Sequence, residues 1–130
     1  MRSSSTPTGV RSRRDGSCLP RVPLRVLRKS QFWFEPAAEH RAAHTAAALP
    51  CFAFDTPAGF YYGFPALDDR GVKVAEHTGG RTVTDPLAID RDIDATERQD
   101  VESFLATHVP GAVGLLTAHA AVVERREAVI

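Results

Sequence analysis

Three short runs of β-branched and aromatic residues, separated by turns, restrict the folds open to this chain more than any other feature. Residues 51–56 and 60–64 flank the tight turn Pro57-Ala58-Gly59, in which proline presets φ and glycine supplies a positive φ. A polar connection over residues 65–70 leads to a third run, residues 71–77. Aromatic and β-branched side chains suit a pleated, half-buried surface. The block therefore predicts three strands joined by short connections.

A longer extended segment precedes this block. Residues 24–35 carry apolar side chains in a roughly alternating pattern and end at Pro36, which predicts one long strand or two strand pieces. The alanine-rich residues 37–48 fit either a short helix or an ordered loop. Trp33 and Phe34 are interpreted as core residues.

A helix is predicted after the block. Residues 96–99, Thr-Glu-Arg-Gln, fit a capping box, and apolar residues then recur at helical spacing until Pro110-Gly111 stops the pattern. Residues 115–130 are apolar first and charged later, and they fit a strand or a helix equally well. The chain is thus predicted to be an α+β protein, with a mixed or antiparallel sheet packed against one helix.

Length and charge set further limits. The chain has 130 residues, of which 43% are hydrophobic and 25% charged, so its composition is that of one globular domain, without a run of about 20 apolar residues for a membrane span. A formal net charge of +0 hides a basic first segment. Residues 1–22 predict a disordered basic leader, with a transit peptide as the alternative. No aromatic residues interleave with the arginines, so we expect no nucleic-acid partner, and a nucleic-acid-binding basic arm stays a third alternative that rests on the leader alone. Without a long apolar run we expect no membrane partner either.

The metal-ligating residue types do not form a recognised site. Cys18 and Cys51 have neither CxxC nor zinc spacing, which favours a reduced, cytoplasmic setting. His40 and His44 stand at i and i+4 without an evident third ligand. The alternating aspartates within residues 90–94 lack the glycine and terminal glutamate of a calcium loop. We therefore expect no metal site.

A set of motifs in a fixed order carries a resemblance to a known enzyme family. In chain order they are Gln31-Phe32-Trp33-Phe34-Glu35-Pro36, Leu49-Pro50-Cys51-Phe52, Gly59-Phe60-Tyr61-Tyr62-Gly63-Phe64-Pro65, Gly71-Val72-Lys73-Val74-Ala75-Glu76-His77, Asp85-Pro86, Phe104-Leu105 and Pro110-Gly111-Ala112. Together they resemble the central segment of FAD-dependent amine oxidases of the monomeric sarcosine oxidase and N-methyltryptophan oxidase type. The resemblance divides the chain into a leader (1–22), a partial substrate-side or catalytic domain (23–116) and a non-matching tail (117–130).

The resemblance implies an oxidase of CH–NH groups that cleaves the C–N bond of a small N-alkyl amino acid and reduces oxygen to hydrogen peroxide. It also implies FAD as the cofactor of an intact parent. The dinucleotide fingerprint G-x-G-x-x-G is absent, however, and neither Cys18 nor Cys51 corresponds to the family's flavin-linked cysteine. Both ends are therefore expected to be cuts or changes of reading frame. We expect the chain alone to retain no flavin, and a complementary FAD-binding chain to be its partner.

Three residues are the candidates for chemistry. Strand periodicity puts Lys73, Ala75 and His77 on one face, and the resemblance implies that Lys73 is the catalytic, oxygen-activating lysine next to the flavin. His77 corresponds to a histidine near flavin and substrate, and Tyr62 to an active-site tyrosine that binds substrate. The alternatives are a solvated lysine, a surface histidine and a core tyrosine. Tyr61, which points to the other face, is interpreted as structural.

A second hypothesis comes from a different class of function. Without a dinucleotide-binding half, a sheet of this kind leaves an apolar face uncovered, and large exposed apolar patches mark interaction sites. The chain would then be a non-catalytic remnant or a partner-binding module that uses the exposed sheet.

Overall fold

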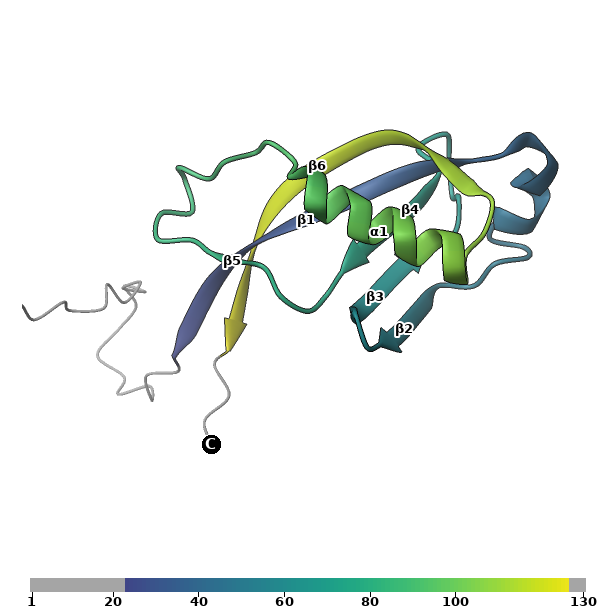
Figure 1. Cartoon of the computed structure of the whole chain (residues 1–130). Helices are drawn as coiled ribbons and strands as arrows, with labels where there is room; N and C mark the ends of the chain where they lie inside the picture. Colours follow the sequence, from purple (N-terminus) through teal and green to yellow (C-terminus); the bar gives the residue numbers. More distant parts are fainter. Residues whose placement is uncertain (1–22, 127–130) are drawn as a thin grey trace, which may run out of the picture.

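A computed structural model describes residues 23–126, with the backbone alone for residues 124–126. The predicted basic leader and Cys18 lie outside the described residues, as do residues 127–130 of the predicted tail. Within the described part, an antiparallel sheet packs against one α-helix, which confirms the predicted α+β class (Figure 1).

Six strands within residues 23–126 form the sheet. They are β1 (Leu24–Pro36), β2 (Phe52–Thr56), β3 (Gly59–Phe64), β4 (Val72–Glu76), β5 (Arg81–Thr82) and β6 (Ala112–Arg126). β2, β3 and β4 form a meander of neighbouring antiparallel strands, and β4 pairs with β1. The three strands of the predicted block are confirmed, each within one residue at either end.

The long strand β1 is the centre of the sheet. Its residues 31–34 pair with β4 and its residues 27–28 with β5, while β6 pairs with it from Leu24 to Pro36. The β1 residues that pair with β4 or β5 also pair with β6. Strand β6 therefore lies along one edge of β1, and β4 and β5 lie along the opposite edge. The undecided residues 115–126 are therefore a strand.

The core lies between one face of the sheet and the helix α1 (Ala95–His108), which runs across the sheet in Figure 1. Side chains of a strand alternate between faces, so every second residue of β1, β3 and β4 points to the helix. The fully enclosed Phe32 and Phe34 are examples. Trp33 corrects one prediction, because it points to the opposite face, where it is only half-buried.

The helix begins two residues earlier than the predicted capping box, whose N-cap would be Thr96. Asp94 is the N-cap, and its carboxylate accepts a hydrogen bond from the Thr96 backbone N–H at 2.7 Å. This bond holds the pKa of Asp94 below its usual value, because it stabilises the charged form. Val101, Phe104 and Leu105 are buried, as the helical spacing predicted.

The alanine-rich segment is better defined than the sequence indicated. The alanine-rich region forms a 3₁₀ helix, η1 (Ala38–His44), whose buried His44 ring nitrogen Nδ1 lies 2.8 Å from the His40 carbonyl. Of the two structures predicted for residues 37–48, a short helix or an ordered loop, the short helix is the one observed. Gly111, which follows α1 with φ +97°, packs against η1, since a Cβ there would lie 2.7 Å from the His40 ring.

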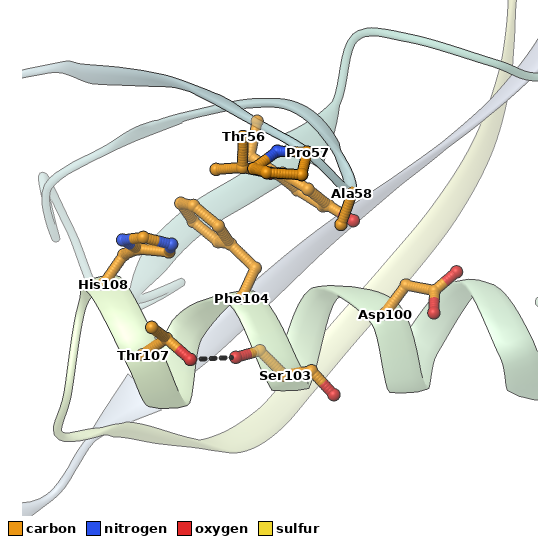
Figure 2. Close-up of a pocket in the computed structure, with 9 residues that line it drawn as sticks. Thr56, Pro57, Ala58, Asp100, Ser103, Phe104, Thr107 and His108 are labelled. Atoms are coloured by element: carbon orange, nitrogen blue, oxygen red, sulfur yellow. Dashed lines mark hydrogen bonds between the residues drawn. The ribbon is translucent and has the colours of Figure 1, made fainter.

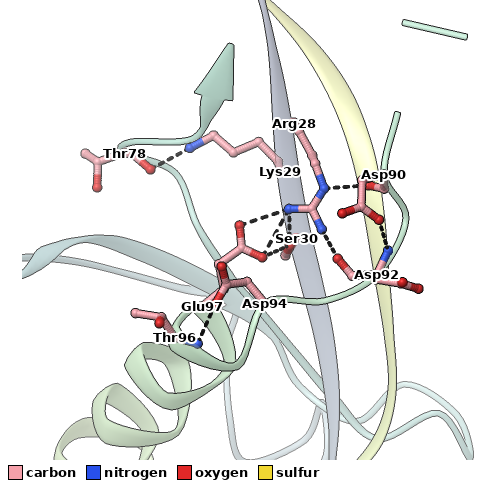
Figure 3. A network of polar contacts seen from close by, with 9 residues as sticks. All are labelled: Arg28, Lys29, Ser30, Thr78, Asp90, Asp92, Asp94, Thr96 and Glu97. Carbon is pink, nitrogen blue, oxygen red and sulfur yellow. Dashed lines mark hydrogen bonds and ion pairs between the residues drawn. The ribbon is translucent and has the colours of Figure 1, made fainter. Parts of the chain in front are cut away.

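Arg28 ties β1 to the loop before α1 and to the start of α1 (Figure 3). Its side chain is only 3% exposed, and Nη1 donates to both carboxylate oxygens of Glu97 at 3.0 and 3.1 Å. Ser30 Oγ donates to the same carboxylate at 2.6 Å. The guanidinium also donates to the carbonyls of Asp90, at 2.7 Å, and of Asp92. Arg28 therefore binds the aspartate-rich residues 90–94 through backbone carbonyls. The Asp90 carboxylate is free to accept from the Asp92 backbone N–H, and the Asp94 carboxylate to cap the helix.

Candidate functional site

The face of the sheet opposite α1 carries the predicted site residues. We define the open face as the side chains Trp33, Tyr62, Phe64, Lys73, His77 and His119. Direct partners in antiparallel strands point to the same face. Trp33 and Phe64 both pair with Lys73, and Tyr62 pairs with Ala75, two residues from Lys73 and from His77. The strand periodicity that placed Lys73 and His77 on one face is confirmed.

Lys73 lies at the centre of the open face. Its Nζ is 5.5 Å from the centroid of the Trp33 ring and 5.4 Å from that of Phe64, so two aromatic rings flank the ammonium. The side chain is half-buried and makes no hydrogen bond or ion pair within the described part of the chain. A fixed cation of this kind is available to an electron-rich or anionic ligand.

Tyr62 and His77 lie together beside this lysine. The Tyr62 ring is 6.3 Å from the Phe64 ring and 6.3 Å from the His77 ring, both in edge-to-face geometry. Phe60 also packs edge-on against His77, at 5.7 Å. His77 follows the last residue of β4, and its N–H donates to the Phe60 carbonyl at 2.6 Å. The fold thus brings all three predicted site residues to one surface.

The open face contains two rings that the sequence did not assign to it. Trp33 was interpreted as core, and His119 was not singled out. β6 places the His119 ring 5.5 Å from the Trp33 ring at an interplanar angle of 75°. The period-2 rule applied to β1 would have put Trp33 opposite Phe32 and Phe34. For His119 no signal existed, because residues 115–123 gave no clear period.

Tyr61 has the opposite environment from Tyr62. It is 3% exposed and stacks on Phe104 of α1, with ring centroids 4.5 Å apart and an interplanar angle of 10°. Burial raises the pKa of the Tyr61 hydroxyl, and the nearby carboxylates of Glu76 and Asp100 raise it further. The interpretation of Tyr61 as a residue outside the open face is confirmed.

Other groups of potential ligands stay apart. His40 and His44 lie with ring centroids 6.3 Å apart, but no third ligand from the described residues joins them. Among residues 23–126, no three His, Cys, Asp or Glu side chains lie close enough to hold a metal ion. No helix in the same range is long and apolar enough to cross a membrane.

Comparisons with known proteins agree with the motif order. No protein-family model matches the chain. Monomeric sarcosine oxidase of Arthrobacter sp. (strain TE1826) is 33% identical over 97 residues, which cover 73% of this chain and 24% of that enzyme. This chain is homologous to part of that oxidase type. The Bacillus sp. (strain NS-129) monomeric sarcosine oxidase is 31% identical over 97 residues, again 73% of this chain and 24% of the enzyme.

A second enzyme name occurs among the relatives. N-methyl-L-tryptophan oxidase of Salmonella typhi is 30% identical over 105 residues, which cover 75% of this chain and 26% of that enzyme. The chain therefore spans about a quarter of the length of the curated relatives it matches. The resemblance to both enzyme types is confirmed over this shared part.

Proposed function

We propose that this chain is the substrate-side sheet of an FAD-dependent oxidoreductase that acts on a secondary amine. The observation that carries the proposal is the Lys73 ammonium on the open face, held between Trp33 and Phe64 without a carboxylate partner among the described residues. Homology to sarcosine and N-methyl-L-tryptophan oxidases supports the reaction class.

The open face fits the ring end of a flavin better than its phosphates. It offers a broad surface of aromatic side chains with one central cation, which suits a planar conjugated ring that becomes electron-rich on reduction. The sequence has no G-x-G-x-x-G turn to seat a pyrophosphate on a helix N-terminus. Lys73 and His77 would thus contact the ring, and another polypeptide segment would hold the nucleotide.

A bound FAD would supply a two-electron oxidation: a hydrogen with its two electrons would leave the amine carbon and a proton would leave the nitrogen, giving an imine, and oxygen would take up two electrons and two protons to give hydrogen peroxide. Lys73 contributes a positive charge that is already in place and so stabilises negative charge that develops beside it. Because Lys73 and His77 are four residues apart, roughly 13 Å along the strand at about 3.3 Å per residue, they lie at different parts of one ring system.

Tyr62 is proposed to bind the substrate. Its ring lies between Phe64 and His77, and it is half-buried, so its apolar body lines the site while the hydroxyl is left to donate to a carboxylate. A small N-alkyl amino acid presents that carboxylate. The relatives' names point to sarcosine and N-methyl-L-tryptophan as the first substrates to test.

A partner-binding module is the second candidate function. The observation that favours it is the same open face, where Phe64 is 36% exposed and Leu67 of the adjoining loop 69%. Such a surface packs against another polypeptide whether or not a flavin lies between them. If the partner is a complementary FAD-binding chain, binding that partner and forming the oxidase are the same function.

The proposal is tested by exchanging the matched segment of Arthrobacter sp. monomeric sarcosine oxidase for the matched segment of this chain. We expect the exchanged enzyme to bind flavin and to form peroxide with a secondary amine. Lys73→Met should lower the oxidation rate by about 100-fold or more with flavin still bound. Arg70→Met, which removes a cation paired with Asp68 in an exposed loop, is the matched control.

Two results would contradict the proposal. One is equal oxidation rates in the Lys73→Met and Arg70→Met enzymes, which would remove Lys73 from the site. The other concerns the chain by itself: it is expected to purify without flavin, and a stoichiometric yellow complex would show that its own residues hold the nucleotide.

A further inference from the structure

A hollow lies on the helix side of the sheet, away from the open face. The Pro57-Ala58 turn between β2 and β3 forms one wall, and α1 forms the other (Figure 2). Asp100, Phe104 and His108 project from successive turns of the helix toward the β2–β3 turn. The hollow has a volume of about 390 Å³, which is enough for a small aromatic compound.

Tyr61 gives this hollow an unusual polar group. The Tyr61 side chain is 3% exposed, yet its hydroxyl makes no hydrogen bond within residues 23–126. In the same part of the chain, no fully enclosed side-chain polar atom lacks a partner, so the hydroxyl opens into the hollow that it lines. Tyrosine hydroxyls that are nearly buried usually have a partner. The open position next to Tyr61 is therefore a place for a ligand atom.

The charges around the hollow favour a cation. Asp100 supplies a carboxylate to its lining, and Glu76 acts on Tyr61 from β4. Burial raises the Tyr61 pKa, and the negative charges of both carboxylates raise it further, so negative charge lies near this hydroxyl. His108 is the other titratable group in the lining, and its ring stands at the far end, 5.0 Å from the Phe104 ring.

The remaining lining is aromatic and apolar. Phe104 lies between Tyr61 of β3, at 4.5 Å, and His108, at 5.0 Å, so three rings in a row line the hollow. Pro57 and Ala58 face them from the turn. Aromatic faces attract ammonium groups and pack well against an apolar body.

We propose that this hollow is a binding site for a small organic ammonium ion with an apolar body. The ammonium donates to the Asp100 carboxylate and to the Tyr61 hydroxyl oxygen, and the apolar body packs between Phe104 and Pro57. The site is separate from the proposed flavin surface, because Tyr61 and Tyr62 point to opposite faces of β3.

The test uses the full chain and follows backbone amide signals by NMR during titration with benzylammonium. Benzyl alcohol, a neutral compound of similar shape, is titrated in parallel. We expect benzylammonium to shift the signals of Asp100, Ser103 and Thr56, and to bind about tenfold more tightly than benzyl alcohol, as one charge-assisted hydrogen bond would give.

Three variants assign the contacts. Asp100→Asn should weaken benzylammonium binding by about tenfold and leave benzyl alcohol unchanged, while Asp69→Asn, which removes an exposed carboxylate from the β3–β4 loop, should change neither. Tyr61→Phe keeps the ring stack and should weaken binding severalfold. Absence of binding, equal binding of the two probes, or equal effects of Asp100→Asn and Asp69→Asn would overturn the proposal.

Discussion

Lys73 and Trp33 are direct cross-strand partners, and the Lys73 ammonium lies 5.5 Å from the centre of the Trp33 ring. Trp33 is the only tryptophan of the chain, so its fluorescence reports on the open face. We expect Lys73→Met to shift Trp33 emission while changing the free energy of unfolding by at most about 2 kcal/mol, the upper range of a cation–π contact. Arg70→Met should leave the emission unchanged. A loss of several kcal/mol would mean that Lys73 is a structural residue.

Arg28 and Glu97 form the ion pair on which the entry to α1 depends. Glu97→Gln leaves the guanidinium, which is 3% exposed, without its counter-ion and should lower the free energy of unfolding by about 2–3 kcal/mol. The control is Glu102→Gln on the same helix, which breaks an exposed pair with Arg98 and should cost at most about 0.5 kcal/mol. Urea unfolding curves measure both. If Glu97→Gln and Glu102→Gln lowered the free energy of unfolding by similar amounts, burial of Arg28 would add nothing to the stability that its ion pair with Glu97 provides.

Tyr61 makes stability depend on alkaline pH. Its pKa in the folded chain is raised, chiefly by burial, above the value near 10 of an unfolded tyrosine. The contribution of the neutral phenol is therefore fully present below about pH 10, and it is lost as the pH rises through the folded pKa, because the unfolded chain releases this proton first. The free energy of unfolding should fall more steeply above pH 10 in the wild type than in Tyr61→Phe. If the free energy of unfolding fell equally steeply above pH 10 in the wild type and in Tyr61→Phe, the raised pKa of Tyr61 would be contradicted.

Asp94, rather than Thr96, caps α1. Asp94→Ala should lower the melting temperature at pH 7 more than Thr96→Ala does, because it leaves the Thr96 backbone N–H without its acceptor. The lowered Asp94 pKa means that this stabilisation is present above about pH 4 and is lost as the pH falls through the folded pKa. The difference between wild type and Asp94→Ala should accordingly shrink in acid. Asp94→Asn keeps the accepting oxygen and serves as the control.

The sequence alone was sufficient to predict those elements whose residue pattern depends on close neighbours in the chain. The Pro57-Ala58-Gly59 turn and its flanking strands were predictable because turn chemistry and period-2 alternation act over a few residues. β6 was not, because its apolar run over residues 115–123 has no clear period and becomes a strand through pairing with β1. Asp94 was missed as the cap because Thr96 offered an equally acceptable local pattern.

The same limit applies to the candidate sites. Lys73, Tyr62 and His77 could be grouped on one surface from strand alternation together with the family resemblance. His119 joins them only after β6 is aligned with β1. The hollow beside Tyr61 depends on how α1 lies across β3, and no local pattern fixes that packing.

The pairing of β1 with β6 also decides when the chain can complete its sheet. Residues near 24 pair with residues near 126, so the longest strand contact joins segments about as distant in sequence as the described part allows. Such contacts form late, since a long loop must close before they form. The edge of β1 that β6 covers therefore stays unpaired during synthesis until the segment near residue 126 has left the ribosome.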